Sequence, residues 1–400
     1  MECSPFAIDR TALARYLPAA PHWPLHPACA HYVCGFGDAD FAKTVRVGND
    51  YLIPRSLTLC FGAPRGGSPI VPGEYLHCLL RALARTAALF DEDREVLYIV
   101  LGEGLPELIG CGGVARLLNA IPQSLRTVAR AEVAVLLRPG NPVAVRSLVA
   151  AGCTRGVLLD DGTASAASRL AAREAIAGAG FAATGHVLAG YPDALRVEEV
   201  LAWRPDRVGL AWLAAVGPTL PRLLADAVQG LGEAGYAPAG ADTFAVAPSP
   251  LWRCGSRAQY CDLTGTVRAE RTDLIGIGAG AESQLGEVFC QAIGDPARWC
   301  AAVAAGRLGI ERGLVQSQDE AMRAEIMQSL ACDYRLDARA MQRTDAMPFH
   351  DDFALALARL RPLEEQGLVS WNDQVLSLSF TGTLLWRIVA ACFQHPASAL

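Results

Sequence analysis

The sequence has few charged residues and no long apolar run. Charged residues make up 19% of its 400 residues, and the formal net charge is −6 at pH 7. Since no run of lysine and arginine forms a basic patch, we expect no nucleic-acid partner. Every apolar run is interrupted before the ~20 residues that a membrane span needs. No basic segment followed by an apolar one opens the chain, so we expect no signal peptide and a cytoplasmic location.

Closely spaced cysteines are also missing. The chain has 13 cysteines, an odd number, and no two of them stand in a C-x-x-C arrangement. In a reducing compartment such scattered cysteines behave mostly as small buried hydrophobic residues and not as disulfides. Their spacing gives no paired thiolates for a metal site.

What the sequence has in quantity is apolar mass, because 52% of its residues are hydrophobic. From Pro54 onward, short apolar runs alternate with helical stretches of about a dozen residues. This alternation indicates parallel βα units covered on both faces, and therefore an α/β fold. It favours a full or partial (β/α) barrel over a doubly wound sheet without deciding between them. The expected strands are Ser56–Phe61, Val96–Leu101, Glu132–Leu137, Thr154–Leu159, Ala182–Leu188 and Arg207–Trp212.

Changes of pattern divide the chain into three predicted domains. Residues 1–50 form an aromatic, Pro- and His-rich arm, residues 51–300 the barrel, and residues 301–400 a C-terminal domain. From about Asp319 the pattern is mainly helical, with a hairpin-like pair before the last helix, which resembles a winged-helix domain. The expected elements there are helices at Glu320–Leu330 and Phe353–Gln366, strands at Leu368–Trp371 and Val375–Phe380, and a helix from near Thr381.

Several segments resemble one known family. Thr272–Ala281 reads T-D-L-I-G-I-G-A-G-A and is similar to the T-D-L-L-G-x-G loop of the oxygen-independent coproporphyrinogen III oxidases. Ser329–Asp337 reads S-L-A-C-D-Y-R-L-D and resembles that family's S-L-x-C-x-F-x-L-D helix. Further matches follow in family order over nearly the whole chain. They are Ala20–Pro27, Arg204–Val208, Gly240–Ala245, Pro362–Val369 and Thr381–Phe393.

The resemblance implies a fold and a chemistry. The implied fold is a partial (β/α)6 TIM-like barrel with an N-terminal arm and a mainly helical C-terminal domain. Catalytic members bind a [4Fe–4S] cluster and two S-adenosylmethionines, and they convert coproporphyrinogen III to protoporphyrinogen IX by oxidative decarboxylation. That chemistry needs three thiolates on the cluster, supplied by a C-x3-C-x2-C motif just after the first strand.

The cluster motif is absent from this sequence. The first two cysteine positions fall on Pro64 and Ser68, and the third finds no cysteine nearby. Cys60 stands where the family has histidine, and Thr58 where it has tyrosine. Since a hydroxyl or a proline cannot replace a thiolate on iron, we expect neither the iron–sulfur cluster nor S-adenosylmethionine as a cofactor.

The loops that would contact S-adenosylmethionine have also changed. The family's G-G-G-T-P loop reads Gly102-Glu103-Gly104-Leu105-Pro106 here. Glycine lets a cofactor come close to the loop backbone, and the side chain of a glutamate restricts that approach. The family's cofactor-binding acidic residues align on Leu136 and His186, and its F-Q-G segment is Leu263-Thr264-Gly265. The glycines that remain in these degenerate loops are Gly102, Gly104, Gly265 and Gly278.

Other polar residues are candidates for a substrate pocket. Asp160 and Asp161 end a predicted strand, where they could serve acid–base chemistry or form an Asp-Gly turn and a helix cap. His186 is either a rim or core histidine or a catalytic one. A ligand with several propionates needs arginines that face one cavity. The candidates lie at or near predicted strand ends or loops, which fits such a pocket and equally fits scattered surface arginines; they are Arg55, Arg65, Arg138, Arg155 and Arg268.

The N-terminal arm holds His22, His26, Cys29 and His31. These residues could supply part of a haem or metal ligand set, or the arm could be a surface segment that happens to contain histidine. The preferred function is a cluster-less, non-catalytic tetrapyrrole- or haem-binding or regulatory protein of haem metabolism. One alternative is an active oxygen-independent coproporphyrinogen III oxidase, and another is a structural partner of a catalytic paralogue.

Overall fold

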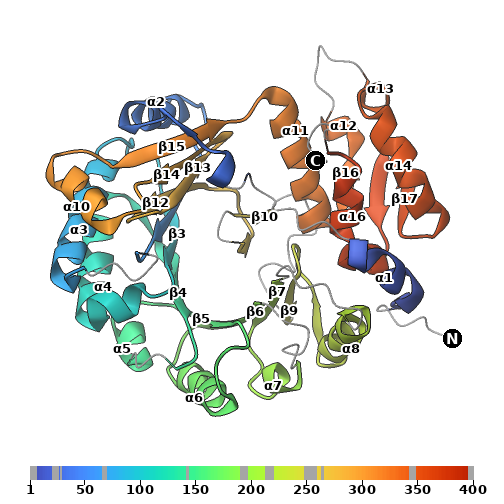
Figure 1. Ribbon diagram of the computed structural model, residues 1–400, viewed down its shortest axis with the longest axis horizontal. Coiled ribbons are helices and arrows are strands. Elements are labelled where there is room, and N and C mark those ends of the chain that lie inside the picture. The colour runs from blue at the N-terminus through green and yellow to red at the C-terminus, as the bar shows by residue number, and fades with distance from the viewer. Residues whose placement is uncertain are drawn as a thin grey trace. The chain divides into compact units, whose positions relative to one another are not determined.

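A computed structural model describes residues 7–19, 27, 29–64, 70–140, 144–189, 197–211, 220–246, 259–262, 265–341 and 348–394. The chain forms two compact units, each built from separate stretches of sequence (Figure 1). The first unit contains Met1–His26, Leu188–Glu270 and Ser317–Leu400, and the second contains Pro27–Val187 and Arg271–Gln316. Domain boundaries at residues 50 and 300 stay a prediction, although residues 301–316 lie in the second unit.

The centre of the second unit is a parallel sheet. Its strands follow the order β12-β2-β3-β4-β5-β6. Neighbouring strands from β12 through β5 pair in parallel. The apolar runs of the sequence become these strands because both faces are covered, as in β2, where Leu57, Leu59 and Phe61 are fully buried. The strands are β2 (Leu57–Phe61), β3 (Val96–Leu101), β4 (Thr127–Leu137), β5 (Arg155–Asp160), β6 (Ala183–Ala189) and β12 (Asp273–Ile277).

Helices cover one face of this sheet, on the outside of the strands in Figure 1. A Cβ atom on Gly156 of β5 would lie 2.6 Å from the ring of Phe181 and 3.1 Å from Ile176 of helix α6, so Gly156 faces the helices. Alternation along a strand then directs Arg155 and Val157 to the opposite face, which we call the inner face. The helices are α3 (Pro72–Ala87), α4 (Leu105–Ser124), α5 (Val145–Ala150) and α6 (Ala166–Ala177).

An antiparallel extension continues the sheet beyond β12 in the order β12-β13-β14-β15-β1. Short strands joined by tight turns, and a helix between β14 and β15, interrupt the apolar pattern of this region. The sequence pattern therefore did not predict it. The elements are β1 (Val33–Cys34), β13 (Glu282–Leu285), β14 (Val288–Ala292), β15 (Ile310–Val315), α2 (Asp38–Asn49), α10 (Pro296–Ala304) and the 3-10 helix η2 (Cys29–His31).

A buried arginine joins the N-terminal ends of β2 and β12. Arg94 Nη2 lies 2.6 Å from Asp273 Oδ2, and Arg94 Nε donates a 2.6 Å hydrogen bond to the carbonyl oxygen of Arg55. Asp273 Oδ1 accepts a 3.1 Å hydrogen bond from Gly286 N. Because the Arg94 side chain is fully buried, its charge requires these partners. This network fixes the end of the sheet opposite to the ends where α/β folds bind ligands.

The first unit combines a small antiparallel sheet with helices. The strands of the sheet follow the order β7-β9-β8, and β10 pairs with β11 in a hairpin. The elements are β7 (Arg207–Ala211), β8 (Tyr236–Pro238), β9 (Thr243–Val246), β10 (Tyr260–Cys261), β11 (Val267–Arg268), α1 (Arg10–Tyr16), the 3-10 helix η1 (Leu17–Ala19), α7 (Val197–Leu201) and α8 (Leu220–Glu233).

The C-terminal part of this unit matches the predicted order of helix, helix, hairpin and helix. Helix α11 begins with a capping box of Ser317 and Glu320, and a π-helix follows it without a break. A sheet of order β16-β18-β17 packs beside the remaining helices. The elements are α11 (Gln318–Gln328), π-helix η4 (Ser329–Asp333), β16 (Arg335–Asp337), α12 (Ala338–Met341), α13 (Phe349–Asp352), α14 (Ala354–Glu365), β17 (Val369–Asn372), β18 (Val375–Leu378), α15 (Phe380–Leu384) and α16 (Trp386–Ala391).

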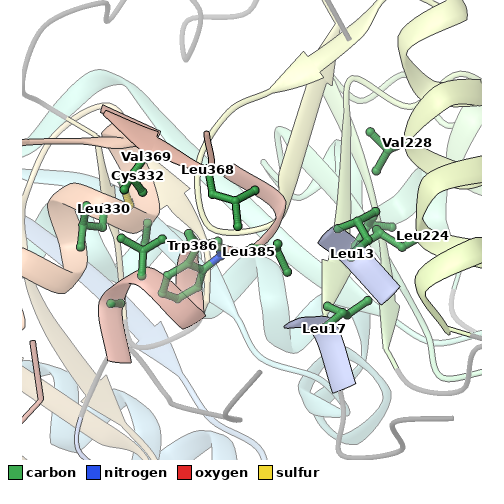
Figure 2. Close-up of a cluster of buried hydrophobic side chains, with 14 of the residues drawn as sticks. Leu13, Leu17, Leu224, Val228, Leu330, Cys332, Leu368, Val369, Leu385 and Trp386 are labelled. Atoms are coloured by element: carbon green, nitrogen blue, oxygen red, sulfur yellow. The ribbon is translucent and has the colours of Figure 1, made fainter. Parts of the chain in front are cut away.

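One apolar core holds the first unit together (Figure 2). Leu13 of α1 and Leu224 of α8 belong to it, as do Leu330 of the π-helix and Trp386 of α16. Residues from both ends of the chain therefore share one core.

Among the described helices, none combines the length and apolar character that crossing a membrane requires.

Candidate functional site

Charged side chains collect at the C-terminal ends of β3, β4 and β5 in the second unit. In α/β folds this edge of a parallel sheet is where ligands bind, because the loops that follow the strands meet there. Two of the predicted pocket residues, Asp160 and Asp161, lie here at the end of β5. A third, His186, lies in the middle of β6. The structure brings Asp160 and His186 together and places Asp161 with other partners.

An ion-pair bridge of Glu103, Arg138 and Asp161 spans this edge. Glu103 follows β3, Arg138 follows β4 and Asp161 follows β5. Arg138 Nη2 donates a 3.1 Å hydrogen bond to Glu103 Oε2, and Nη1 pairs with Asp161 Oδ2. The hydrogen bond to Glu103 raises the pKa of Arg138, and hydrogen bonds from Thr163 together with Arg138 lower the pKa of Asp161. The pairing of Arg138 with Asp161 therefore favours the charged form of both side chains.

Asp160 belongs to a different cluster, on the helix-covered face. Its Oδ2 lies 3.6 Å from His186 Nε2 and 3.7 Å from Arg169 Nε of α6, and its Oδ1 accepts a 3.0 Å hydrogen bond from Gly162 N. Burial would raise the pKa of Asp160, but the bonds from His186 and Gly162 and the charge of Arg169 lower it. All three side chains are at most 7% exposed. This arrangement holds an ionised carboxylate inside the fold.

Close contacts or backbone conformation within the chain explain the glycines of the degenerate cofactor loops. A Cβ atom on Gly102 would lie 2.8 Å from the carbonyl oxygen of Phe61, and one on Gly278 would lie 2.6 Å from that of Gly62. Gly104 has φ +78° at the N-cap of α4, and Gly278 has φ +131°. Only glycine adopts such backbone readily. Gly265 lies in the first unit, in the turn between β10 and β11, and the other three lie in the second.

The segment after β2 does not fit an iron–sulfur cluster. Pro64 offers no ligand atom, Ser68 falls outside the described residues and would offer only a hydroxyl, and Cys60 is a strand residue paired with Val100 and Gly276. The cluster requires several thiolates at one place. Across the described ranges, no group of three or more His, Cys, Asp or Glu side chains could hold a metal ion.

The predicted haem or metal ligands of the arm are only partly described. His22 and His26 lie outside the described residues, and His31 is exposed at the end of η2 with Cys29 at its start. The ligand set of His22, His26, Cys29 and His31 therefore stays a prediction.

The predicted arginines do not converge on one place. Arg55 lies before β2, 3.6 Å from Asp273, at the opposite end of the sheet from Asp160, Asp161 and His186. Arg268 pairs with Asp262 at 2.7 Å inside the first unit. Arg65 lies outside the described residues. Arg138 belongs to the ion-pair bridge, and Arg155 pairs with Glu132 at 3.2 Å.

Sequence reasoning missed the carboxylate partners Glu103 and Glu132. In the sequence, Glu103 stands out only as a departure from the family's glycine loop. A signal was available, because Glu103 and Arg138 directly follow neighbouring predicted strands, and parallel strands bring such positions together at one edge.

Comparison with known proteins agrees with the family resemblance. No family model matches the chain. The oxygen-independent coproporphyrinogen III oxidase of Salmonella typhimurium is 25% identical over 437 aligned positions, which cover 96% of this chain and 94% of the relative. The enzyme of the same name from Escherichia coli is 24% identical with the same coverage. That from Synechocystis is 23% identical and covers 95% of this chain and 93% of the relative.

The solved structures confirm the predicted fold class. The coproporphyrinogen III oxidase of Escherichia coli, a radical SAM enzyme, superposes with a TM-score of 0.81 at 22% identity, covering 98% of this chain and 99% of the other. The parallel sheet of the second unit is part of a partial TIM-like barrel, with a mainly helical C-terminal region. By sequence and fold, the chain is therefore a relative of the oxygen-independent coproporphyrinogen III oxidase family along 96% of its length, and it lacks the C-x3-C-x2-C motif.

Proposed function

We propose that this protein is a non-catalytic relative of the coproporphyrinogen III oxidases that binds a porphyrin or haem and serves tetrapyrrole metabolism without radical chemistry. One combined observation carries the proposal. The positions for cluster thiolates hold Pro64 and Ser68, and the ion-pair bridge of Glu103, Arg138 and Asp161 occupies the C-terminal ends of β3, β4 and β5. A catalytic paralogue would be the natural partner of such a protein.

The bridge supports the loss of S-adenosylmethionine because it supplies charges that satisfy each other. The family's loop after β3 offers glycine backbone, whereas Glu103 here places a carboxylate at that position and pairs it with Arg138. A cofactor that entered would have to separate this pair and desolvate both charges. The retained scaffold, by contrast, gives a reason to expect a tetrapyrrole ligand, since a relative named for coproporphyrinogen aligns over 96% of the chain at 25% identity.

Iron and absorbance analysis tests the first half of the proposal. After anaerobic reconstitution with iron and sulfide, we expect a colourless protein with sub-stoichiometric iron. The Salmonella typhimurium relative is the positive control. A Pro64→Cys, Ser68→Cys, Val71→Cys variant restores the C-x3-C-x2-C spacing and tests whether missing thiolates are the cause. A brown wild-type protein with about four irons per chain would overturn the proposal.

Titration with haem and with coproporphyrin III tests the second half. Binding should shift the Soret band and quench porphyrin fluorescence, with saturation at micromolar concentrations. Absence of both changes up to tens of micromolar would reject tetrapyrrole binding.

An active coproporphyrinogen III oxidase is the second candidate. It is favoured by the 25% identity that extends over nearly the whole chain. The same reconstitution separates the two candidates, because an active enzyme needs the cluster and would release carbon dioxide from coproporphyrinogen III in the presence of S-adenosylmethionine and a reductant.

A further inference from the structure

Arg155 lies on the inner face of the sheet in the second unit. It begins β5, where it is the register partner of Ala134, and Ala134 is the partner of Val100 on β3. Its neighbour Gly156 faces the helices, so Arg155 must face the other way. A Cβ atom on Gly185 of β6 would lie 3.4 Å from Arg155 Nη2, which places the guanidinium beside β6 on that inner face.

The guanidinium of Arg155 is buried and only partly paired. Its side chain is 6% exposed, and Nη1 donates a 3.2 Å hydrogen bond to Glu132 Oε1. Its Nε is buried without a hydrogen-bond partner, and within the described part of the chain Nη2 makes no hydrogen bond either. A buried charge with unsatisfied donors is costly. Arg94, equally buried, is satisfied through all three of its nitrogens, by Arg55, Asn49 and Asp273.

The guanidinium atoms of Arg155 that lack a hydrogen-bond acceptor indicate which chemical group would bind there. Nε and Nη2 of a guanidinium donate in parallel along one edge, and that edge matches the two oxygens of a carboxylate. Glu132 uses Nη1 and leaves the Nε–Nη2 edge to another acceptor. The nearby inner-face positions are Tyr98, Val100 and Ala134 in register and Gly185 alongside. These residues carry no charge, so they fit the apolar body of a carboxylate-bearing ligand.

We infer that Arg155 binds a carboxylate of the protein's ligand through its Nε–Nη2 edge. The inference rests on the proposed function, in which the ligand is a porphyrin and the carboxylate is one of its propionates. A Cβ atom on Gly185 would be in van der Waals contact with Nη2, 3.4 Å away, so glycine leaves this side of the guanidinium uncovered. Glu132 holds the guanidinium in place from the other side.

Paired variants test the inference. Arg155→Lys keeps the positive charge but loses the two parallel N–H donors of the guanidinium. Arg155→Met combined with Glu132→Gln removes both charges without leaving a buried carboxylate unpaired. Arg55→Lys is the matched control, because Arg55 lies at the opposite end of the strands. Circular dichroism and thermal midpoints verify that each variant folds. The probes are coproporphyrin III and its tetramethyl ester, followed by fluorescence quenching, and propionate, followed by thermal shift.

We expect both Arg155 variants to bind coproporphyrin III roughly 10-fold to 100-fold more weakly. Arg55→Lys should bind like the wild type, and the ester should bind weakly to every variant. Equal coproporphyrin affinity in wild type and Arg155 variants overturns the inference and leaves the proposed function intact.

If the wild-type protein binds no porphyrin, the proposed function fails. The thermal shift with propionate then tests by itself whether Arg155 binds a carboxylate. A thermal shift in wild type that both Arg155 variants lack supports a carboxylate site for another ligand. No thermal shift in the wild-type protein means that ordered water, and not a carboxylate, accepts the remaining hydrogen bonds of Arg155. The inference is then wrong.

Discussion

At the scale of single residues, Asp333 is a carboxyl group whose charged form is disfavoured by its surroundings. It ends the π-helix that follows α11. Burial, and after it the charge of Glu325, raise the pKa of Asp333 to about 6, against the opposing charge of Arg335. A folded-state pKa above the unfolded value means that the fold is favoured while the group is protonated. That stability is fully present below about pH 4, the ordinary Asp value, and is lost as the pH rises through about 6.

Replacing Asp333 by asparagine should therefore stabilise the protein at neutral pH. We expect a gain of about 1–2 kcal/mol above pH 7, after allowance for solvent screening, and almost none near pH 4. Urea unfolding at both pH values measures it. Asp351→Asn, an exposed change in α13, is the control. A gain that is the same at both pH values would contradict the ionisation argument.

Asp160 and Asp161 show how far residue type alone could predict the site. The sequence placed both at a strand end, and the structure agrees. Because consecutive strand residues point to opposite faces, however, Asp160 joins His186 and Arg169 on the helix side, while Asp161 joins Arg138 in the bridge. Paired carboxylates in sequence are therefore not a pair in space.

At the scale of elements, Tyr75 of α3 clamps the end of β2 to the turn after β12. Its hydroxyl donates a 2.7 Å hydrogen bond to Gly62 O and accepts a 3.0 Å hydrogen bond from Ala279 N. The ring packs against Trp299 of α10, with centroids 5.5 Å apart. Burial of this phenol raises its pKa strongly. The clamp holds in place the backbone at the end of β2 and in the turn after β12.

Tyr75→Phe should destabilise the protein by about 1–3 kcal/mol, because it leaves the carbonyl of Gly62 and the N–H of Ala279 without their partner. Chemical denaturation measures the loss. Tyr51→Phe, which removes the same hydroxyl from a side chain that is 56% exposed, should have little effect. Equal effects of the two substitutions would show that the clamp contributes nothing.

The sequence predicted the parallel strands well and the antiparallel ones poorly. Val96–Leu101 is observed with the predicted bounds, because a continuous apolar run between turn residues fits a buried strand. Strands β13 to β15 lie in a segment with no such runs, where β13 reads E-S-Q-L. Its pairing with β12 and β14 is set by tertiary contacts that no local pattern reveals.

At the scale of the whole molecule, the core of the first unit depends on segments far apart in the chain. Leu13 of α1 is fully buried, and in Figure 2 it lies beside Leu224 of α8. Helix α1 is also tied to the C-terminal part, since Asp9 N donates a 2.9 Å hydrogen bond to Thr381 Oγ1. The N-terminal arm predicted as a separate element is thus partly core.

Leu13→Ala should lower the stability of the protein by about 2–5 kcal/mol, because it opens a cavity in that core. Denaturant unfolding followed by tryptophan fluorescence checks it, and Trp386 in the same core gives a local signal. Leu52→Ala, at a side chain that is 99% exposed, is the control. A change smaller than about 1 kcal/mol would mean that α1 does not belong to the cooperative core.

The sequence by itself determined which cysteine motif is missing and which family the chain resembles. Thiolate ligands are a matter of residue type and spacing, and a buried strand is a matter of local apolar pattern, so both can be read along the chain. Only the tertiary structure decided which charges meet. The bridge through Arg138 and the half-satisfied guanidinium of Arg155 depend on strand register and on which face each side chain takes. Those are set by packing between segments distant in sequence.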